Sequence, residues 1–100
     1  LPYVKLIGDP NKEIEKVSVC SGSGSSYIRQ AARVSDLYIT GDIKYHDAQE
    51  ALSLGLTVID VGHYFSENIA LPYVVKHIKT RLSDLDIICS KVDGNVFKIR

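Results

Sequence analysis

The chain contains no methionine and no tryptophan, and it has no excess of charge of either sign. Its 12 basic side chains are balanced by 12 acidic ones, and the two kinds are interspersed. Such a chain lacks the positive patch with which proteins attract a nucleic acid or an anionic bilayer. The composition therefore argues against nucleic acid as a partner.

Long apolar runs are absent as well. No stretch approaches the roughly 20 apolar residues that span a bilayer, and the first residues do not show the charged and apolar regions of a secretory signal. Only two cysteines occur, Cys20 and Cys89, far apart in the sequence. Such a pair is typical of reduced thiols rather than of a disulfide framework. We therefore expect a cytoplasmic protein with no membrane partner.

The missing methionine also bears on the ends of the chain. Translation starts at methionine, and its removal normally leaves a small residue first, whereas this sequence starts at Leu1. We therefore expect a piece of a longer protein. One hundred residues can bury one core but are too few for two. Residues 1–100 are expected to form a single α/β domain.

Short β-branched runs alternate with amphipathic stretches along most of the chain. The runs at 16–20, 36–40 and 56–61 predict strands. The stretches 26–35 and 47–54 between them predict helices, because small and apolar residues recur on one helical face. Strands that alternate with helices in this way favour a parallel sheet with right-handed crossovers.

The two ends of the sequence are less regular. Residues 3–7 predict a further strand, and the longest helix is expected over about 66–82. Pro72 lies too deep in that helix to be its first residue, so the helix is either kinked or begins near Leu71. Two last strands are predicted at 86–90 and 96–99, joined by a turn over 93–95. The expected fold class is α/β: half of a three-layer α/β/α sandwich, with a βαβαβ core of mainly parallel strands plus C-terminal strands.

Polar loops that contain glycine follow each of the three central predicted strands, at 21–26, 41–46 and 62–67. Ligands of open α/β sheets collect at the carboxyl ends of the strands. The sequence therefore predicts a binding cleft along this edge of the sheet.

The first of these loops is a candidate phosphate-binding loop. It connects a strand to a helix, so its backbone amides and the helix N-terminus could hold an anion. The residues concerned are Gly22, Ser23, Gly24 and Ser25. The loop is neither a Walker sequence nor a complete dinucleotide fingerprint. A turn of small residues in which Ser25 or Ser26 caps the helix is the alternative.

The third loop contains a histidine and a glutamate in a pattern that suits a metal ion. Glu67 lies within about 40° of the apolar stripe of the helix that follows, so its carboxylate is expected to point inward and to need a partner. His63 stands at the strand end and could share an ion with it. Nitrogen and oxygen ligands suit zinc, iron or manganese. Alternatively, Ser66 caps the helix and Glu67 complements its dipole.

The second loop crowds His46 beside two acids, Asp42 and Asp47, and its imidazole could serve as a proton donor, a ligand or a substrate contact. Asp47 is as well explained as a helix N-cap, and the whole loop as a solvated turn. His77 lies about 120° from the apolar stripe of the last helix, so we expect it to be exposed.

Residues 36–51 and 58–67 closely resemble the carboxyl-terminal half of the Nif-three-like dinuclear metal proteins, often described as type 2 GTP cyclohydrolase I. The turn at 20–26 matches this family too, and the most specific element is Gly-His-x-x-x-Glu at 62–67. The resemblance covers roughly residues 3–99. It implies that His63 and Glu67 are metal ligands in a hydrolase with two divalent metal ions, whose subunits form ring-shaped homohexamers.

The same resemblance implies that part of the site is missing. Family members carry a histidine pair and an aspartate in their amino-terminal half, and no two histidines are adjacent here. The chain is therefore expected to be the second half of such a protein, following the first half or an inserted domain, and to bind metal weakly by itself. For a GTP substrate, 21–26 would seat the phosphates, while His46 or Asp42 would position the substrate or move protons. The alternatives are a regulatory or protein-interaction module with a structural metal, and a nucleotide-binding domain without catalysis.

Overall fold

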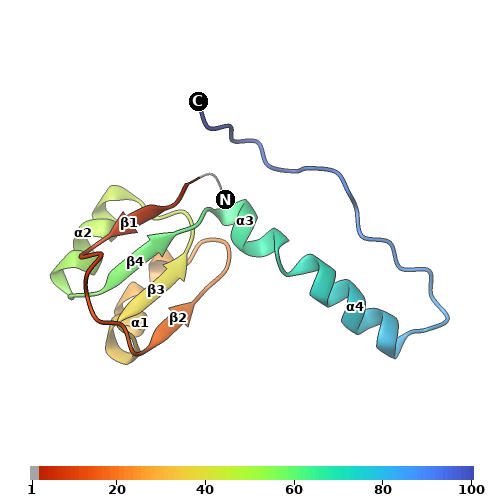
Figure 1. The fold of residues 1–100 in the computed structure, drawn as a ribbon, viewed down its shortest axis with the longest axis horizontal. Coiled ribbons are helices and arrows are strands. Elements are labelled where there is room, and N and C mark those ends of the chain that lie inside the picture. Colours follow the sequence, from red (N-terminus) through yellow and green to blue (C-terminus); the bar gives the residue numbers. More distant parts are fainter. Residues whose placement is uncertain (1–2) are drawn as a thin grey trace.

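The computed structural model of the chain describes residues 3–100. Residues 3–62 form a sheet with two covering helices, two further helices within 63–81 lead away from it, and residues 82–100 return as an extended segment (Figure 1). We call residues 3–62 the sheet unit and residues 63–100 the arm. None of the helices within the described residues is long and apolar enough to cross a membrane.

Four strands form one mixed sheet in the order β1-β4-β3-β2. Their bounds are Lys5–Ile7 for β1, Val17–Val19 for β2, Leu37–Thr40 for β3 and Thr57–Asp60 for β4. Strands β2, β3 and β4 are parallel, whereas β1 pairs with β4 in the antiparallel sense. The predicted α/β fold with a mainly parallel core is confirmed.

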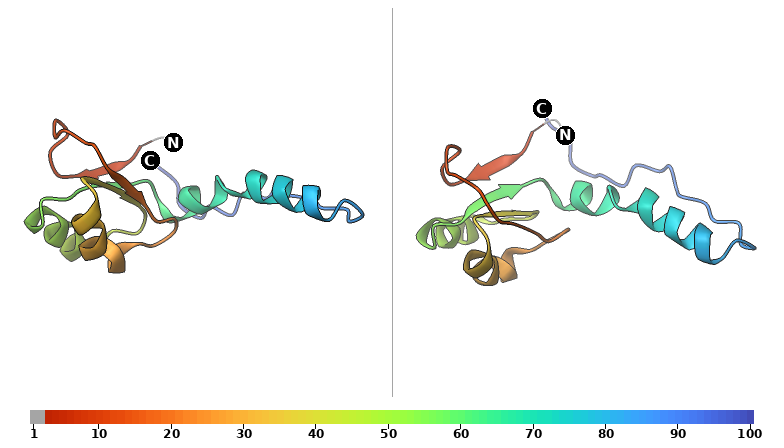
Figure 2. Two further views of the ribbon diagram at one scale, coloured as in Figure 1. Left: turned by 90° about the horizontal axis from the view of Figure 1, so that it is seen from below. Right: turned by 60° about the horizontal axis from the view of Figure 1, so that its bottom comes forward.

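Two helices cover one face of this sheet (Figure 2). A 3-10 turn, η1 (Ser25–Tyr27), leads into α1 (Ile28–Val34), and α2 (Tyr45–Ser53) lies beside α1. Helix α2 ends before Gly55, whose φ of +71° suits the predicted stop. The buried core lies between these helices and the central strands, and consists of Ile28, Ala31, Tyr38, Ala51, Leu56 and Val58. Cys20 and Cys89 are both free thiols, as expected.

The arm begins with α3 (His63–Asn68) and continues with α4 (Leu71–Arg81). The single helix expected over 66–82 is therefore two helices. Pro72 lies in the first turn of α4, where its missing N–H costs no hydrogen bond. Of the two readings of Pro72, the one in which a helix begins near Leu71 is confirmed, and His77 is exposed as expected.

The strands predicted at 86–90 and 96–99 do not form, so this part of the prediction is wrong. Residues 82–100 run back past α4 without a helix or a strand, and the turn residues at 93–95 join no hairpin (Figure 1). A short run of β-branched and apolar residues indicates only that a segment suits a sheet. A strand also requires a neighbour for its backbone groups, and the arm offers none among residues 3–100.

The arm makes the molecule elongated. The radius of gyration is 16.3 Å, whereas a compact domain of this length has a value of about 13 Å. The sheet unit therefore accounts for the compact part of the structure.

Candidate metal centre

The three loops predicted to share one edge of the sheet do meet there. A Cβ atom on Gly41 would lie 2.5 Å from the Gly22 carbonyl oxygen and 2.7 Å from the His63 nitrogen. These distances are too short for any side chain, so glycine at position 41 lets the backbones of the loops approach one another. Candidate residues from separate parts of the sequence are thereby brought together.

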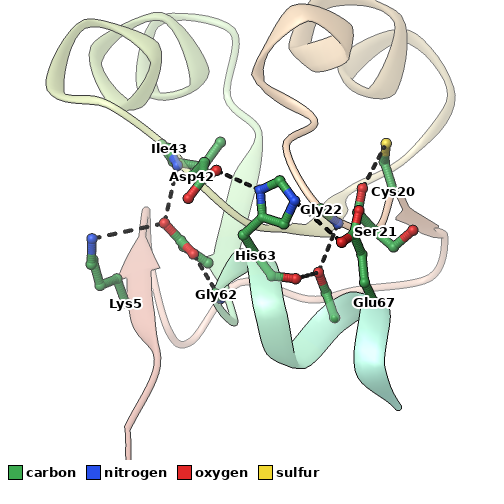
Figure 3. A network of polar contacts seen from close by, with 11 residues as sticks. Lys5, Cys20, Ser21, Gly22, Asp42, Ile43, Gly62, His63 and Glu67 are labelled. Atoms are coloured by element: carbon green, nitrogen blue, oxygen red, sulfur yellow. Dashed lines mark hydrogen bonds and ion pairs between the residues drawn. The ribbon is translucent and has the colours of Figure 1, made fainter. Parts of the chain in front are cut away.

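The His63 imidazole lies between two carboxylates (Figure 3). Its Nδ1 atom is 2.6 Å from Oδ2 of Asp42, and its Nε2 atom is 3.3 Å from Oε2 of Glu67. His63 and Glu67 lie one turn apart in α3 and so share a helix face. The structure thus brings together three of the residues singled out in the sequence.

The two carboxylates change the acid–base behaviour of this histidine. The hydrogen bond with Asp42 raises the pKa of the His63 imidazole above its ordinary value, and the negative charge of Glu67 adds to that rise. Partial desolvation acts in the opposite direction but does not outweigh them. The side chains are 44%, 53% and 57% exposed for His63, Asp42 and Glu67, so an ion from solvent can reach them.

The predicted inward orientation of Glu67 is wrong, because Glu67 belongs to α3, whereas the apolar stripe from which its orientation was extrapolated belongs to the separate helix α4. Gly62, with a φ of +88°, precedes α3 and lets it start at His63. Glu67 consequently lies beyond the first turn and faces solvent. Ser66 is not the cap but lies inside α3, where its hydroxyl donates to the His63 carbonyl at 2.9 Å and accepts the Gly22 N–H at 2.8 Å.

A buried aspartate that the sequence analysis did not single out connects two of the loops. Asp60, only 5% exposed, accepts the Ile43 N–H on Oδ2 at 3.1 Å and the Gly62 N–H on Oδ1 at 2.9 Å. The Lys5 ammonium lies 3.9 Å from Oδ2. The sequence feature that could have identified Asp60 is that it is the one charged residue in the predicted strand 56–61. Its carboxylate ties the loop that carries Asp42 to the turn that carries His63.

The candidate phosphate loop forms a wall of the same site. Gly22 has a φ of +74°, and a Cβ there would lie 2.5 Å from Oε1 of Glu67 and 3.3 Å from Nε2 of His63. The Gly22 N–H is used by Ser66, and the Gly24 carbonyl accepts the Tyr38 hydroxyl at 2.8 Å. The alternative in which Ser25 or Ser26 caps the helix is wrong, since the N-caps of η1 and α1 are Gly24 and Tyr27.

His46 lies apart from this cluster, within α2. Its Nδ1 atom is 3.1 Å from the Gln49 amide oxygen, and its ring contacts that of Tyr45 edge-on. Helix α2 begins two residues earlier than the expected Asp47, with Lys44 as N-cap. Asp47 therefore stands at the third helical position, where its Oδ2 accepts the Lys44 N–H at 3.1 Å. Asp47 stabilises the helix start, although not as the N-cap.

A cavity of about 530 Å³ opens on the Asp42 side of His63. The sheet unit contributes Lys5 and Asp60 to its lining, and the C-terminal segment contributes Phe97 and Ile99. This segment is held near the site where the Gly94 N–H donates to the Tyr64 hydroxyl at 3.2 Å.

His63 and Glu67 have the chemistry of half a metal shell. An imidazole nitrogen and a carboxylate oxygen face one another in the open, and position 22 leaves space that a Cβ would fill. Within residues 3–100, however, no group of three or more His, Cys, Asp or Glu side chains is arranged to hold an ion. The chain therefore offers two ligands rather than a complete site.

Known proteins are similar to this chain in sequence and fold. Residues 1–96 match the family described as Duf34/NIF3 (NGG1p interacting factor 3). A Bacillus subtilis protein named GTP cyclohydrolase 1 type 2 homolog is 37% identical over 99 residues, which cover 94% of this chain and 26% of that protein. A Streptococcus pneumoniae protein with the same name is 51% identical over 94 residues, which cover 89% and 35% of the two chains.

The similarity extends to solved structures. A Bacillus cereus protein related to NIF3 superposes with a TM-score of 0.91 at 30% identity, covering 100% of this chain and 29% of that one. The arm is included in that match. The chain therefore spans about a quarter to a third of the length of these relatives.

Proposed function

Because the chain belongs to the Duf34/NIF3 family, we propose that it is the part of a dinuclear-metal-dependent hydrolase that supplies half of the metal-binding site. Relatives named GTP cyclohydrolase 1 type 2 homolog support this proposal. The observation that carries it is the position of His63 Nε2 beside Glu67 Oε2, one helical turn apart and open to solvent. Two ligands with the same spacing on a helix bind zinc in other enzymes.

His63 and Glu67 would supply a nitrogen and an oxygen ligand, which suits zinc, iron or manganese. The remaining ligands of two divalent ions would come from other parts of a longer protein. When bound, such ions supply an activated water and polarise the group under attack. The chain's own residues hold the ions and shape the cavity beside them. By itself, the chain is expected to bind metal weakly.

We propose a nucleotide such as GTP as the substrate. The wall formed by Gly22, Ser23, Gly24 and Ser25 is the proposed seat for its phosphates, although the Gly22 N–H would first have to leave Ser66. Asp42 and His46 are proposed to position substrate or move protons. The contact between Asp42 and His63 supports the first assignment more than the second. A cytoplasmic homohexamer is the proposed state of the complete protein.

The test is elemental analysis of the full-length protein that carries this sequence. We expect the variants His63→Ala and Glu67→Ala to lose metal, because each removes a ligand. His77→Ala, which removes an exposed histidine from α4, is the matched control and should keep the wild-type content. Unchanged metal in both ligand variants would rule out the assignment.

A GTP hydrolysis assay on the metal-loaded protein then separates an enzyme from a scaffold. Turnover that disappears in the ligand variants would support the hydrolase. A flat trace at confirmed two-metal occupancy would contradict it.

One observation favours a second function, that of a protein-interaction module with a structural metal. The arm exposes large apolar side chains, among them Tyr73 at 75%, Ile88 at 81% and Val96 at 83%. Such surfaces mark binding sites for other proteins. The coordination shell distinguishes the two functions, because a catalytic ion keeps an open position for water whereas a structural ion is closed by protein ligands.

A further inference from the structure

We propose that Asp42 is a positioning residue for His63. Its carboxylate accepts the Nδ1–H of the imidazole and thereby leaves the Nε2 lone pair directed at Glu67, where the metal ion would bind. This inference rests on the proposed function, because it concerns how the same ligand pair is held.

The first argument is the contact itself. Oδ2 of Asp42 and Nδ1 of His63 are 2.6 Å apart, slightly shorter than the roughly 2.7–2.9 Å of charge-assisted N–H···O hydrogen bonds. An ionised carboxylate can only accept, so the proton of this bond belongs to Nδ1. A neutral imidazole has a single N–H, and Nε2 is then free to bind a metal. Carboxylates commonly hold metal-binding histidines in this way.

The second argument is the backbone at Asp42. Its φ is +56°, and no other non-glycine residue among 3–100 has a positive value. This conformation is unfavourable for most L-residues, and aspartate and asparagine tolerate it best. It persists where surrounding contacts hold it. Here it places the carboxylate against a histidine 21 positions further along the chain.

The third argument is the support from Asp60. One of its oxygens accepts the N–H of Ile43, the residue after Asp42, and the other accepts the N–H of Gly62, the residue before His63. A single buried carboxylate therefore holds the two loops together. The backbone beside Asp42 and the backbone beside His63 are therefore both held by Asp60, so their contact does not depend on the two side chains alone.

The decisive experiment reads the tautomer of His63 in the metal-free chain. Imidazole nitrogen chemical shifts of the ¹⁵N-labelled protein are followed as the pH is raised until they stop changing, and at that plateau they show which nitrogen of the neutral ring carries the proton. The same samples are then titrated with zinc. The variants are Asp42→Gly and Asp42→Asn, because both residue types accept a positive φ. Asp84→Asn, an exposed residue far from the site in the sequence, is the control with the same charge change.

The wild-type chain should carry its proton on Nδ1. In Asp42→Gly the proton should move to Nε2 or divide between the nitrogens, and zinc affinity should fall about 10–100-fold. Asp42→Asn keeps an acceptor, so it should retain the tautomer and lose less affinity. Asp84→Asn should match the wild type in both measurements.

A wild-type proton on Nε2, or an unchanged tautomer in Asp42→Gly, would overturn the positioning role. If the amide spectrum shows that Asp42→Gly is unfolded, the positioning role is judged from the tautomer of His63 in the wild type and in Asp42→Asn. The tautomer is read without metal, so it settles this inference even if two ligands bind zinc too weakly to titrate. Zinc affinity that is unchanged in both His63→Ala and Glu67→Ala would instead overturn the proposed metal site and leave the tautomer result standing.

Discussion

The sheet unit and the arm differ in how their apolar residues are used. All core residues belong to the sheet unit, between Ile28 and Val58, whereas none of residues 63–100 is buried. The sheet unit is therefore stabilised by its own packing, and the apolar side chains of the arm are left for another surface. The candidate metal centre lies at the border. Its supporting carboxylates, Asp42 and Asp60, come from the sheet unit, and both ligands come from the first helix of the arm.

The largest expected effect tests whether packing is confined to the sheet unit. Tyr38→Ala should lower the free energy of unfolding by about 3–5 kcal/mol, because Tyr38 is 2% exposed and its loss opens a cavity. Tyr73→Ala makes the same change in the arm, where the side chain is 75% exposed, and should cost less than about 0.5 kcal/mol. Urea denaturation measures both. Equal losses of unfolding free energy in the two variants would show that packing is not confined to the sheet unit.

The next effect concerns the connection between the two parts. Asp60→Asn should destabilise the chain by about 1–3 kcal/mol, because an amide can accept on only one atom, so one of the two part-buried hydrogen bonds from Ile43 and Gly62 to a charged carboxylate is lost. It should also weaken the Asp42–His63 contact, visible as a change in the His63 ring shifts. The control Asp84→Asn should alter neither stability nor those shifts.

A smaller effect should appear as a pH dependence of the sheet unit. Backbone N–H groups of Glu15 and Lys16 donate to the Asp36 carboxylate and lower its pKa. A carboxyl with a lower pKa in the folded state contributes stability above its unfolded pKa, and that contribution is lost as pH falls through the folded value. The urea midpoint should therefore decline below about pH 4. In Asp36→Asn this decline should be shallower, and an identical pH profile would exclude the assignment.

The smallest expected effect comes from the C-terminal segment. Phe97→Ala should change the free energy of unfolding by less than about 0.5 kcal/mol, because the ring is 76% exposed. Hydrogen exchange gives a second measurement of the difference in stability between the sheet unit and the C-terminal segment. Amides of β3 and β4 should exchange only through global unfolding, and those of residues 82–100 within the dead time. Strong protection in that segment would reveal pairing that the described chain does not show.

Much of the fold could be predicted from the sequence because it depends on local patterns. The periods of apolar residues predicted every strand of the sheet and both covering helices, with ends that moved by a few residues. Gly55 marked the end of a helix correctly. The spacing of His63 and Glu67 also placed them on one helix face. The C-terminal strands failed, because a short apolar run cannot supply the neighbour that a strand needs.

The candidate site was predictable only in part. The sequence by itself determined that three polar loops would follow three parallel strands, and that a histidine and a glutamate would stand one turn apart. Only the tertiary structure decided what surrounds them. In the register of β3 and β4, Thr40 pairs with Asp60. That pairing brings Asp42 to His63 and lets Asp60 hold both loops, across separations of about 20 residues that no local period encodes.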